Sequence, residues 1–400
     1  MGAVLGLVLA VGVAPVAASP GAAGRGAAGG TGAGRSVWAQ VSAGDRHTCG
    51  ITVAGRLYCW GSDAAGQLGD GGTNTDQGAP VEVAGGRKVW VQVTAGGFHT
   101  CARTVRGQLW CWGSDFWGQL GNGGANTDVG APVQVTGGGG AWADVSAGYQ
   151  HTCGRTLGGR LWCWGNDGSG RLGDDAAVAD RTEPTEVAGA TADWRTVTAG
   201  TFHTCAVKRS GRLFCWGLDS AGQLGDGPPL VGRHTPVEVA GGRTDWTAIA
   251  LGRSHTCGLQ RSGALACWGW DDAGQLGDDA AHADQASPVP VAGGPWRAVT
   301  AGGYHTCASG RAARGFGDQV YCWGLDTYGA LGDGAPLADQ PLPVPVSGGV
   351  GVLSALDAGE YHTCARLDLG RLRCWGLDSN GQLGDGGTNT DQAAPVLVAG

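Results

Sequence analysis

Apolar residues alternate with small or polar residues in many short stretches of this chain. Residues 38–44, WAQVSAG, show the alternation, and a second short apolar stretch and a Gly-containing turn follow them. A period of two is typical of β-strands with one buried face, and no stretch of useful length has the period of a helix. The pattern therefore predicts an all-β protein built from short strands.

The short stretches belong to seven copies of one unit. His-Thr-Cys occurs seven times, at spacings of 52, 52, 52, 52, 50 and 57 residues. Each copy continues through a turn to Cys-Trp-Gly, then to a loop such as DAAGQLG at residues 63–69, and ends near a Pro-Val-x-Val stretch such as residues 80–83. About four short strands in a unit of roughly 50 residues indicate a β-propeller blade.

The repeated motifs resemble the regulator of chromosome condensation repeat family. WGxDxxGQLG, AGxxHT and the repeat spacing carry the resemblance, which covers residues 38–400. The resemblance implies a seven-bladed β-propeller, as in secreted bacterial members of the family. Two features depart from the family pattern: aspartates such as Asp63 stand where asparagine is usual, and paired cysteines are not general in the family.

The two ends of the repeat region predict how the ring closes. The chain stops at Gly400, just after the strand expected at residues 395–398, whereas a Trp-led strand follows that position in the other units. Residues 38–44 form a Trp-led strand with no unit before it. We therefore expect the N-terminal strand to complete the last blade and close the ring, since closure removes exposed sheet edges.

The cysteines fall into seven pairs, one in each unit. A three-residue turn at residues 53–55, with Gly55 in the left-handed conformation, places Cys49 opposite Cys59 in a hairpin. Opposed cysteines of a non-hydrogen-bonded pair lie about 4.5 Å apart at Cα, which suits a disulfide. The predicted pairs are Cys49–Cys59, Cys101–Cys111, Cys153–Cys163, Cys205–Cys215, Cys257–Cys267, Cys307–Cys322 and Cys364–Cys374.

Two other interpretations of the cysteines stay open at this point. Reduced core thiols would have the same spacing, and a metal site would need a fourth ligand that does not recur beside His47, Cys49 and Cys59. A redox pair would be Cys-x-x-Cys beside a helix, which is absent from the sequence. The pattern favours structural disulfides, and seven of them would require an oxidising compartment.

The first residues also point to export. Residues 1–18 contain an uncharged apolar run that is too short for a membrane-spanning helix of about 20 residues and fits a signal peptide, although no Lys or Arg precedes it. Residues 19–37 are rich in Gly and Ala, and we expect a flexible lead-in there. The sequence therefore predicts an extracellular or cell-surface protein without a membrane span.

The charge balance argues against nucleic acid as a partner. The chain has 26 Lys and Arg against 34 Asp and Glu, a formal net charge of −8, and no basic tail or stripe. Nucleic-acid-binding proteins usually carry a basic patch that pairs with phosphates. We expect no nucleic acid partner and no anionic membrane as the main target.

Residues that recur in every unit are expected to serve the fold, because an active site on a ring is needed only once. The seven His-Thr-Cys histidines, such as His47, are expected to hydrogen-bond neighbouring backbone, and the recurring aspartates to bond loop amides. The acidic stretches 70–76 and 385–391 lack the glutamate that completes an EF-hand loop, so we expect polar turns there. We expect no metal, no cofactor and no catalytic residue.

The variable residues suggest where function lies. Strand direction alternates along a blade, so the corner at Asp45-Arg46 and the loop at residues 62–66 should lie at the same end of the ring, as should their counterparts. Nine aromatic residues outside the repeated positions fall in these two sets of loops, and they are Phe98, Phe116, Trp117, Tyr149, Phe202, Trp270, Tyr304, Tyr328 and Tyr361. Aromatic anchors among charges suit a protein-binding face.

The sequence therefore predicts a monomeric, exported binding module that holds a protein partner, with carbohydrate as another ligand class to consider. The alternative interpretation of the nine rings is that several of them plug the tapering end of the propeller. Alternative functions are guanine nucleotide exchange with chromatin binding, which the family resemblance implies, and glycan cleavage, for which no single-copy catalytic constellation is present.

Overall fold

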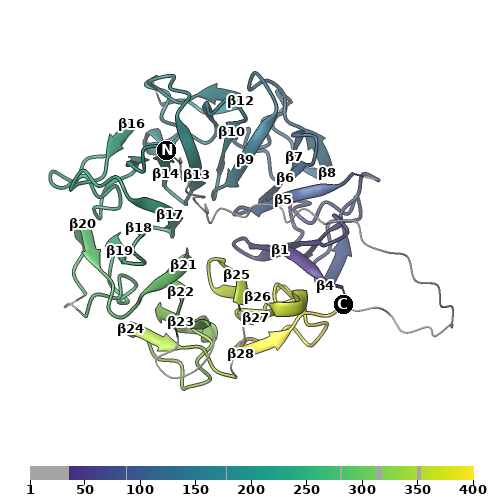
Figure 1. The fold of residues 1–400 in the computed structure, drawn as a ribbon. Helices are drawn as coiled ribbons and strands as arrows, with labels where there is room; N and C mark the ends of the chain where they lie inside the picture. Colours follow the sequence, from purple (N-terminus) through teal and green to yellow (C-terminus); the bar gives the residue numbers. More distant parts are fainter. Residues whose placement is uncertain (1–35, 87, 177, 280–281, 312–317, 349–352) are drawn as a thin grey trace, which may run out of the picture.

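Seven antiparallel sheets of four strands surround a central axis, which confirms the predicted seven-bladed β-propeller (Figure 1). The computed structural model describes residues 36–400 except 87, 177, 280–281, 312–317 and 349–352. The predicted signal peptide, residues 1–18, and most of the predicted lead-in lie outside the described residues. Within the described part, no helix is long and apolar enough to cross a membrane.

Each blade, numbered one to seven in chain order, takes its four strands from one continuous segment. The innermost strands are β1 (Trp38–Ala43), β5 (Trp90–Ala95), β9 (Trp142–Ala147), β13 (Trp194–Ala199), β17 (Trp246–Leu251), β21 (Trp296–Ala301) and β25 (Leu353–Ala358). The second strands are β2 (His47–Thr52), β6 (His99–Thr104), β10 (His151–Thr156), β14 (His203–Lys208), β18 (His255–Gln260), β22 (His305–Arg311) and β26 (His362–Leu367).

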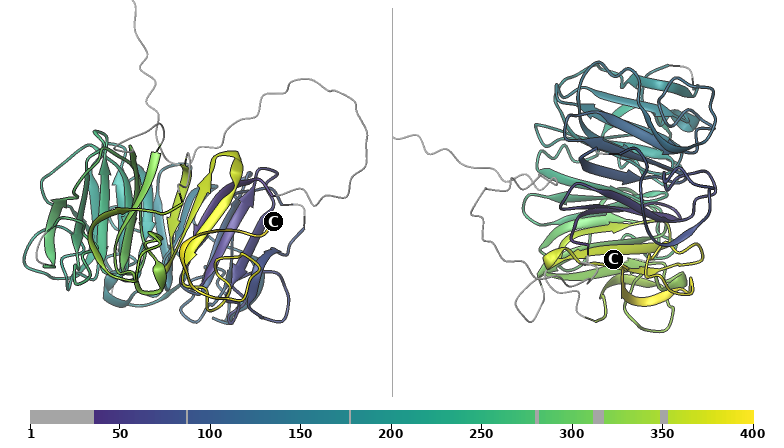
Figure 2. Two further views of the ribbon diagram at one scale, coloured as in Figure 1. Left: turned by 90° about the horizontal axis from the view of Figure 1, so that it is seen from below. Right: turned by 90° about the vertical axis from the view of Figure 1, so that its right-hand side faces the viewer.

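The two outer strands of each blade follow in the same order, so the chain moves from the axis to the rim. The third strands are β3 (Leu57–Gly61), β7 (Leu109–Gly113), β11 (Leu161–Gly165), β15 (Leu213–Gly217), β19 (Leu265–Gly269), β23 (Asp318–Gly324) and β27 (Leu372–Gly376). The fourth strands are β4 (Gln77–Glu82), β8 (Val129–Gln134), β12 (Arg181–Glu186), β16 (Arg233–Glu238), β20 (Gln285–Pro290), β24 (Gln340–Pro345) and β28 (Gln392–Leu397). In side view the strands cross the thickness of a flat ring (Figure 2).

The prediction that the N-terminal strand completes the last blade is wrong. β1 pairs with β2 inside blade one, and blade seven has its own innermost strand, β25. The seventh unit has Leu353 where the other six units have tryptophan, so a search for Trp-led strands does not find this strand. The ring instead closes by packing of two complete blades, with β28 lying near blade one (Figure 1).

The central hairpin of each blade has the predicted register. Cys49 faces Cys59 and Ile51 faces Leu57, the Thr52 amide donates to the Arg56 carbonyl over 2.9 Å, and Gly55 has φ +76°. All seven predicted cysteine pairs are disulfides, with Cα–Cα distances of 4.0 to 4.1 Å, slightly shorter than expected. They lie fully buried in the spaces between blades, so they staple the middle strands of every sheet.

One carbonyl of each blade accepts two hydrogen bonds from the next blade. The Gln67 carbonyl of blade one accepts from the Thr100 hydroxyl over 2.8 Å and from the Trp112 indole over 2.9 Å. The Gln382 carbonyl of blade seven accepts from Thr48 and Trp60 in the same way, so the closing junction matches the other six. The Cys-Trp-Gly tryptophans, each 0% exposed, therefore belong to the core between blades.

The recurring histidines form a closed ring of hydrogen bonds with these threonines. His47 Nε2 lies 2.8 Å from Thr100 Oγ1, and the series continues around the ring until His362 meets Thr48. Because each threonine donates its hydroxyl hydrogen to the carbonyl, the histidine Nε2 must carry the hydrogen of this bond. The expectation that these histidines bond backbone is therefore wrong, because their Nε2 atoms bond the threonine hydroxyls of the next blade instead.

The histidine ring predicts how stability depends on pH. Burial lowers the pKa of His47 and His99 to about 3, whereas an unfolded histidine keeps a pKa near 6.5. The unfolded chain therefore binds more protons between about pH 3 and 6.5, and each histidine lowers the free energy of unfolding by up to about 1.4 kcal/mol per pH unit as the pH falls. Burial also raises the pKa of the recurring aspartates, such as Asp63 and Asp115, to about 6. Between about pH 4 and 6 the folded chain therefore binds more protons at these groups than the unfolded chain, so they raise the free energy of unfolding as the pH falls.

We therefore expect a shallow change in stability between about pH 6 and 4 and a steep loss below pH 4, where only the histidines still act. Urea unfolding followed by circular dichroism at pH 7, 5 and 3.5 would measure this profile. A denaturation midpoint at pH 3.5 equal to that at pH 5 would contradict the expected effect of the buried histidines.

Candidate functional site

The two sets of variable loops lie at one end of the ring, which we call the loop face. The Ser62 amide in the loop after β3 donates to the Arg46 carbonyl in the corner after β1 over 2.8 Å. The same bond joins the two loops of every other blade, at 2.8 to 3.0 Å. The inference that both loops share one end therefore holds for the whole ring.

Four of the nine predicted binding aromatics form a continuous chain of rings over blades five to seven. Trp270 packs edge-on against Tyr304 at 5.5 Å, Tyr304 stacks on Tyr361 at 5.3 Å, and Tyr328 packs edge-on against Tyr361 at 5.5 Å. Rings from neighbouring blades thus contact one another directly, which preorganises this part of the loop face.

The other five aromatics lie over blades two to four. Phe98 contacts Tyr149 at 5.5 Å, and Phe116 contacts Trp117 at 4.7 Å. Phe202 has no aromatic neighbour within the described residues, but the guanidinium groups of Arg171 and Arg253 lie over it, each 5.6 Å from the ring centre.

The exposure of the nine rings argues against simple plugging of the propeller end. None of the nine is buried, whereas every Cys-Trp-Gly tryptophan is 0% exposed. Phe116 is 67% exposed, Tyr328 is 38% exposed, and the other seven are half-buried. Half-buried rings keep part of their apolar surface in water, and that surface is available to a partner.

Tyr328 stands out because its backbone is left-handed, with φ +69°. In five blades the residue that corresponds to Tyr328 is followed two positions later by a glutamine whose side chain accepts its amide hydrogen. In blade one, for example, Gln67 Oε1 accepts the Ala65 amide over 2.9 Å. Blades three and six have Arg171 and Ala330 in that place, and only there does the corresponding loop residue, Ser169 or Tyr328, have positive φ. A bulky residue at positive φ is strained. We attribute the left-handed conformation of Tyr328 to the absence of this glutamine bond in blade six.

Ala330→Gln should restore the regular loop in blade six. The new side chain would accept the Tyr328 amide, return Tyr328 to negative φ and remove its edge contact with Tyr361. A crystal structure of the variant would show this directly. An unchanged left-handed Tyr328 beside a properly placed glutamine side chain would contradict the explanation.

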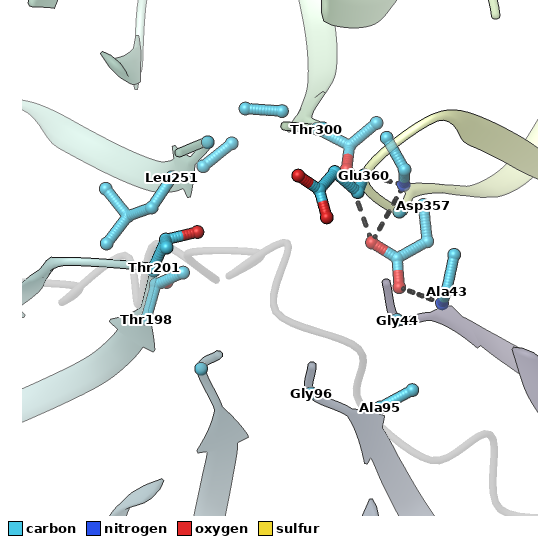
Figure 3. Close-up of a pocket in the computed structure, with 18 of the residues that line it drawn as sticks. Ala43, Gly44, Ala95, Gly96, Thr198, Thr201, Leu251, Thr300, Asp357 and Glu360 are labelled. Carbon is cyan, nitrogen blue, oxygen red and sulfur yellow. Dashed lines mark hydrogen bonds between the residues drawn. The ribbon is translucent and has the colours of Figure 1, made fainter. Parts of the chain in front are cut away.

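The mouth of the central channel opens at the centre of the loop face. The ends of the seven innermost strands and their corners line a cavity of about 250 Å³ (Figure 3). Arg253 Nη1 of blade five reaches over blade six to Glu360 Oε1 of blade seven at 3.2 Å. Gly303 permits this crossing, because a Cβ there would lie 2.5 Å from Glu360 Cγ.

Two carboxyl groups meet at this mouth. Burial and the adjoining Glu360 carboxyl raise the pKa of Asp45 to about 8. Deeper in the channel, burial raises the pKa of Asp357 to about 6, although its carboxylate accepts from the Ala43 amide and the Thr300 hydroxyl. The sequence predicts that the Asp45 corner lies at this end of the ring, and the fold brings Arg253 and Glu360 to it.

A second hollow adjoins the aromatic chain. It has a volume of about 590 Å³, and its lining residues include Tyr328, Tyr361, Arg46, Asn389 and Asp391. The hollow extends the loop face from blade six across blade seven to blade one. It thus adds two aromatic rings and several polar side chains to the loop face.

The opposite end of the ring also has exposed apolar side chains, which the sequence analysis did not identify. They lie in the hairpin turns between second and third strands of neighbouring blades, and they are Val53 at 69% exposure, Val105 at 64%, Leu157 at 67% and Leu369 at 84%. The Val53 and Val105 amides donate to the carbonyls of Val37 and Val89, which are 43% and 49% exposed, so this end has an aliphatic surface whereas the loop face has the chain of aromatics.

The acidic loops behave as turns. Asp63 Oδ1 accepts the Leu68 amide over 2.9 Å, and Asp76 Oδ1 accepts the Asp63 amide over 2.8 Å. The recurring aspartates therefore bond loop amides as expected, while the second aspartate, thirteen residues later, was not foreseen. No group of three His, Cys, Asp or Glu side chains is placed to hold a metal ion within the part of the chain that the structure describes.

Comparison with known families supports the repeat assignment. The RCC1-like domain model matches residues 143–400. A regulator of chromosome condensation (RCC1) repeat model matches residues 54–103 and 106–154, and a second RCC1 repeat model matches residues 38–67 and 90–119.

Two curated relatives differ in how much of their length is shared. The ultraviolet-B receptor UVR8 of Arabidopsis thaliana is 30% identical over 371 residues, which cover 90% of this chain and 81% of the receptor. The human E3 ubiquitin-protein ligase HERC2 is 32% identical over 54% of this chain, but the match covers only 4% of HERC2.

Solved structures share the fold at lower identity. Human WBSCR16 superposes with a TM-score of 0.77 at 21% identity, covering 86% of this chain and 94% of that chain. Yeast RCC1 (Prp20), solved bound to Kap60, superposes with a TM-score of 0.75 at 21% identity, covering 88% and 85%. With the repeat matches and the similarity to UVR8, these findings establish that the chain belongs to the RCC1 repeat family.

Proposed function

We propose that this protein is an exported binding module that holds a protein partner on the loop face and has no catalytic activity of its own. The observation that carries the proposal is the set of nine aromatic rings at one end of the propeller, none buried and most touching a ring or guanidinium from another loop. Aromatic residues and arginine contribute most of the energy in many protein interfaces.

Rigidity supports a binding role. The seven disulfides and the closed histidine–threonine ring fix the strands from which the loops project. A preorganised surface loses little conformational entropy when it binds, so more of the contact energy contributes to affinity.

The disulfides also support export. Disulfides persist in oxidising compartments and are rare in the cytosol and nucleus, where thiols are kept reduced. The apolar run within residues 1–18 agrees with a secretory route. Nuclear guanine nucleotide exchange with chromatin binding fits less well, because the chain is acidic and carries seven disulfides.

The test uses the intact, oxidised propeller as bait in the extracellular medium of its own source, with captured proteins identified by mass spectrometry. We expect a protein that, once purified, binds saturably to the oxidised propeller and not to the reduced, unfolded chain. Equal binding to both forms would contradict the proposal. Exchange activity on a small GTPase, measured with the same sample, would favour the alternative.

A further inference from the structure

The central mouth of the loop face has walls made of small residues and a rim that carries charged side chains. Glycine and alanine at the ends of the innermost strands, such as Ala43, Gly44 and Ala95, line the cavity of about 250 Å³ (Figure 3). Asp45, Tyr149, Arg253 and Glu360 project from the corners of four different blades. A volume of about 250 Å³ suits a single extended side chain better than a loop or a helix.

Of two adjoining carboxyl groups at this mouth, only one has an ion pair among the described residues. Arg253 pairs with Glu360 at 3.2 Å, but Asp45 adds a second carboxyl group beside Glu360. Asp45 is only 7% exposed, and its Oδ1 atom has no hydrogen-bond partner among the described residues. A protonated Asp45 shares a hydrogen bond with Glu360, but no donor reaches its Oδ1 atom among the described residues, so this oxygen is free to accept a hydrogen bond from a ligand.

The surrounding rings suit a delocalised cation. Tyr149 lies close enough for Asp45 and Glu360 to affect its phenol, and Phe98 packs against the Tyr149 ring at 5.5 Å. On the other side, Arg253 already lies over Tyr304 at 5.5 Å, which shows that guanidinium groups are accepted on these rings. A planar guanidinium can stack on a ring and offer several N–H donors to two carboxyl groups at once.

We propose that the mouth binds the guanidinium of one arginine side chain from the protein partner, between Asp45 and Glu360. This inference rests on the proposed binding role of the loop face and names the chemistry that the partner presents at its centre. An anion is disfavoured by the two carboxyl groups, and a metal ion would lack a third ligand of the His, Cys, Asp or Glu type within the described residues.

Binding should release a proton from Asp45. Its carboxyl faces Glu360 of blade seven, Arg253 of blade five, Tyr149 of blade three and Arg46 of its own corner. Burial and Glu360 keep Asp45 protonated near neutral pH, whereas a guanidinium between the carboxyl groups favours the ionised form. Affinity should therefore rise by up to about tenfold per pH unit until the pH passes about 8.

The test uses Nα-acetyl-arginine amide as the probe and the uncharged Nα-acetyl-citrulline amide, which has nearly the same shape, as its control. Protein labelled with ¹³C at alanine methyl groups reports binding through Ala43, Ala301 and Ala358, which line the mouth. We expect the arginine probe to shift these signals, with an affinity at least about tenfold higher at pH 9 than at pH 6.5. The citrulline probe should leave them unchanged.

Asp45→Asn should remove the dependence on pH and weaken binding of the arginine probe at pH 9 by about tenfold or more. Glu360→Gln provides a second variant should the first disturb the fold, which the thermal melting temperature would reveal. Shifts of equal size with citrulline, unchanged affinity in both variants, or shifts outside the mouth would overturn the proposal. A lysine probe that binds more tightly than arginine would overturn the choice of guanidinium.

The outcomes separate this inference from the proposed function. If the purified partner binds but neither the arginine probe nor Asp45→Asn has an effect, the mouth proposal fails while the binding role stands. If the probe binds at the mouth but no protein binds saturably, the mouth proposal stands and the binding role fails.

Discussion

Reduction of the seven disulfides should unfold the propeller at neutral pH and room temperature. Six of the disulfides close loops with a sequence separation of 10 residues and one closes a loop with a separation of 15. Each contributes up to about 3 kcal/mol in the chain-entropy model, although the seven contributions do not simply add. Since a domain is typically stable by about 5 to 15 kcal/mol, losing most of them exceeds the available margin.

Circular dichroism and urea unfolding with and without a thiol reductant measure this effect. One Cys153→Ala, Cys163→Ala double variant serves as the matched comparison and should remain folded, with stability lowered by about 2 to 3 kcal/mol. If the fully reduced protein kept the urea midpoint of the oxidised protein, the disulfides would not be responsible for the stability of the blades.

Replacing Trp117, Trp270 and Tyr304 together with alanine should abolish binding of the partner. The three residues come from blades two, five and six, so the change removes anchors from opposite sides of the loop face. Truncating one anchor residue in an interface often costs about 2 kcal/mol or more, so three should lower the affinity by at least about a thousandfold. Biolayer interferometry with the purified partner would measure the loss.

The matched control is the triple alanine variant of Val53, Val105 and Leu157, which lie exposed in turns at the opposite end of the ring. It removes three exposed apolar side chains as well, yet we expect its affinity to equal that of the unmodified protein. Both variants should keep the melting temperature within a few degrees. Loss of binding in the turn variant, with binding kept in the aromatic variant, would move the site to the other face.

The hairpin register follows from local residues and was predictable. Gly55 and the distance between Cys49 and Cys59 permit one alignment, and seven copies of the motif remove the ambiguity of a single hairpin. Ring closure was predicted wrongly because it depends on one substituted residue, Leu353. Without the expected tryptophan the last innermost strand could not be recognised, although its pairing with β26 is regular.

The candidate site was predictable in position but not in its contacts. Alternation of strand direction alone places the nine aromatics at one end. The corner after the first strand of a blade and the loop after the third strand are separated by two antiparallel strands, so the chain returns to the end from which it started. The stacking of Tyr304 on Tyr361 and the reach of Arg253 to Glu360 join residues that are 57 and 107 positions apart in the sequence. Such contacts depend on how neighbouring blades pack, which no local pattern encodes.

The left-handed conformation of Tyr328 shows a third kind of limit. The sequence contains its cause, the replacement of glutamine by Ala330, but the role of that glutamine becomes visible only when five intact loops can be compared with two altered ones. Once known, the link between this glutamine and a regular loop conformation can be applied to other repeats of this kind.

Hydrogen–deuterium exchange of the propeller with and without its purified partner tests the central claim most directly. We expect slower exchange in the corner and loop peptides that contain Tyr149, Trp270, Tyr304 and Tyr361, and no change in the hairpin turns at Val53 and Val105. Protection confined to the hairpin turns, with the loop face exchanging as in the free protein, would contradict the assignment of the loop face as the binding surface.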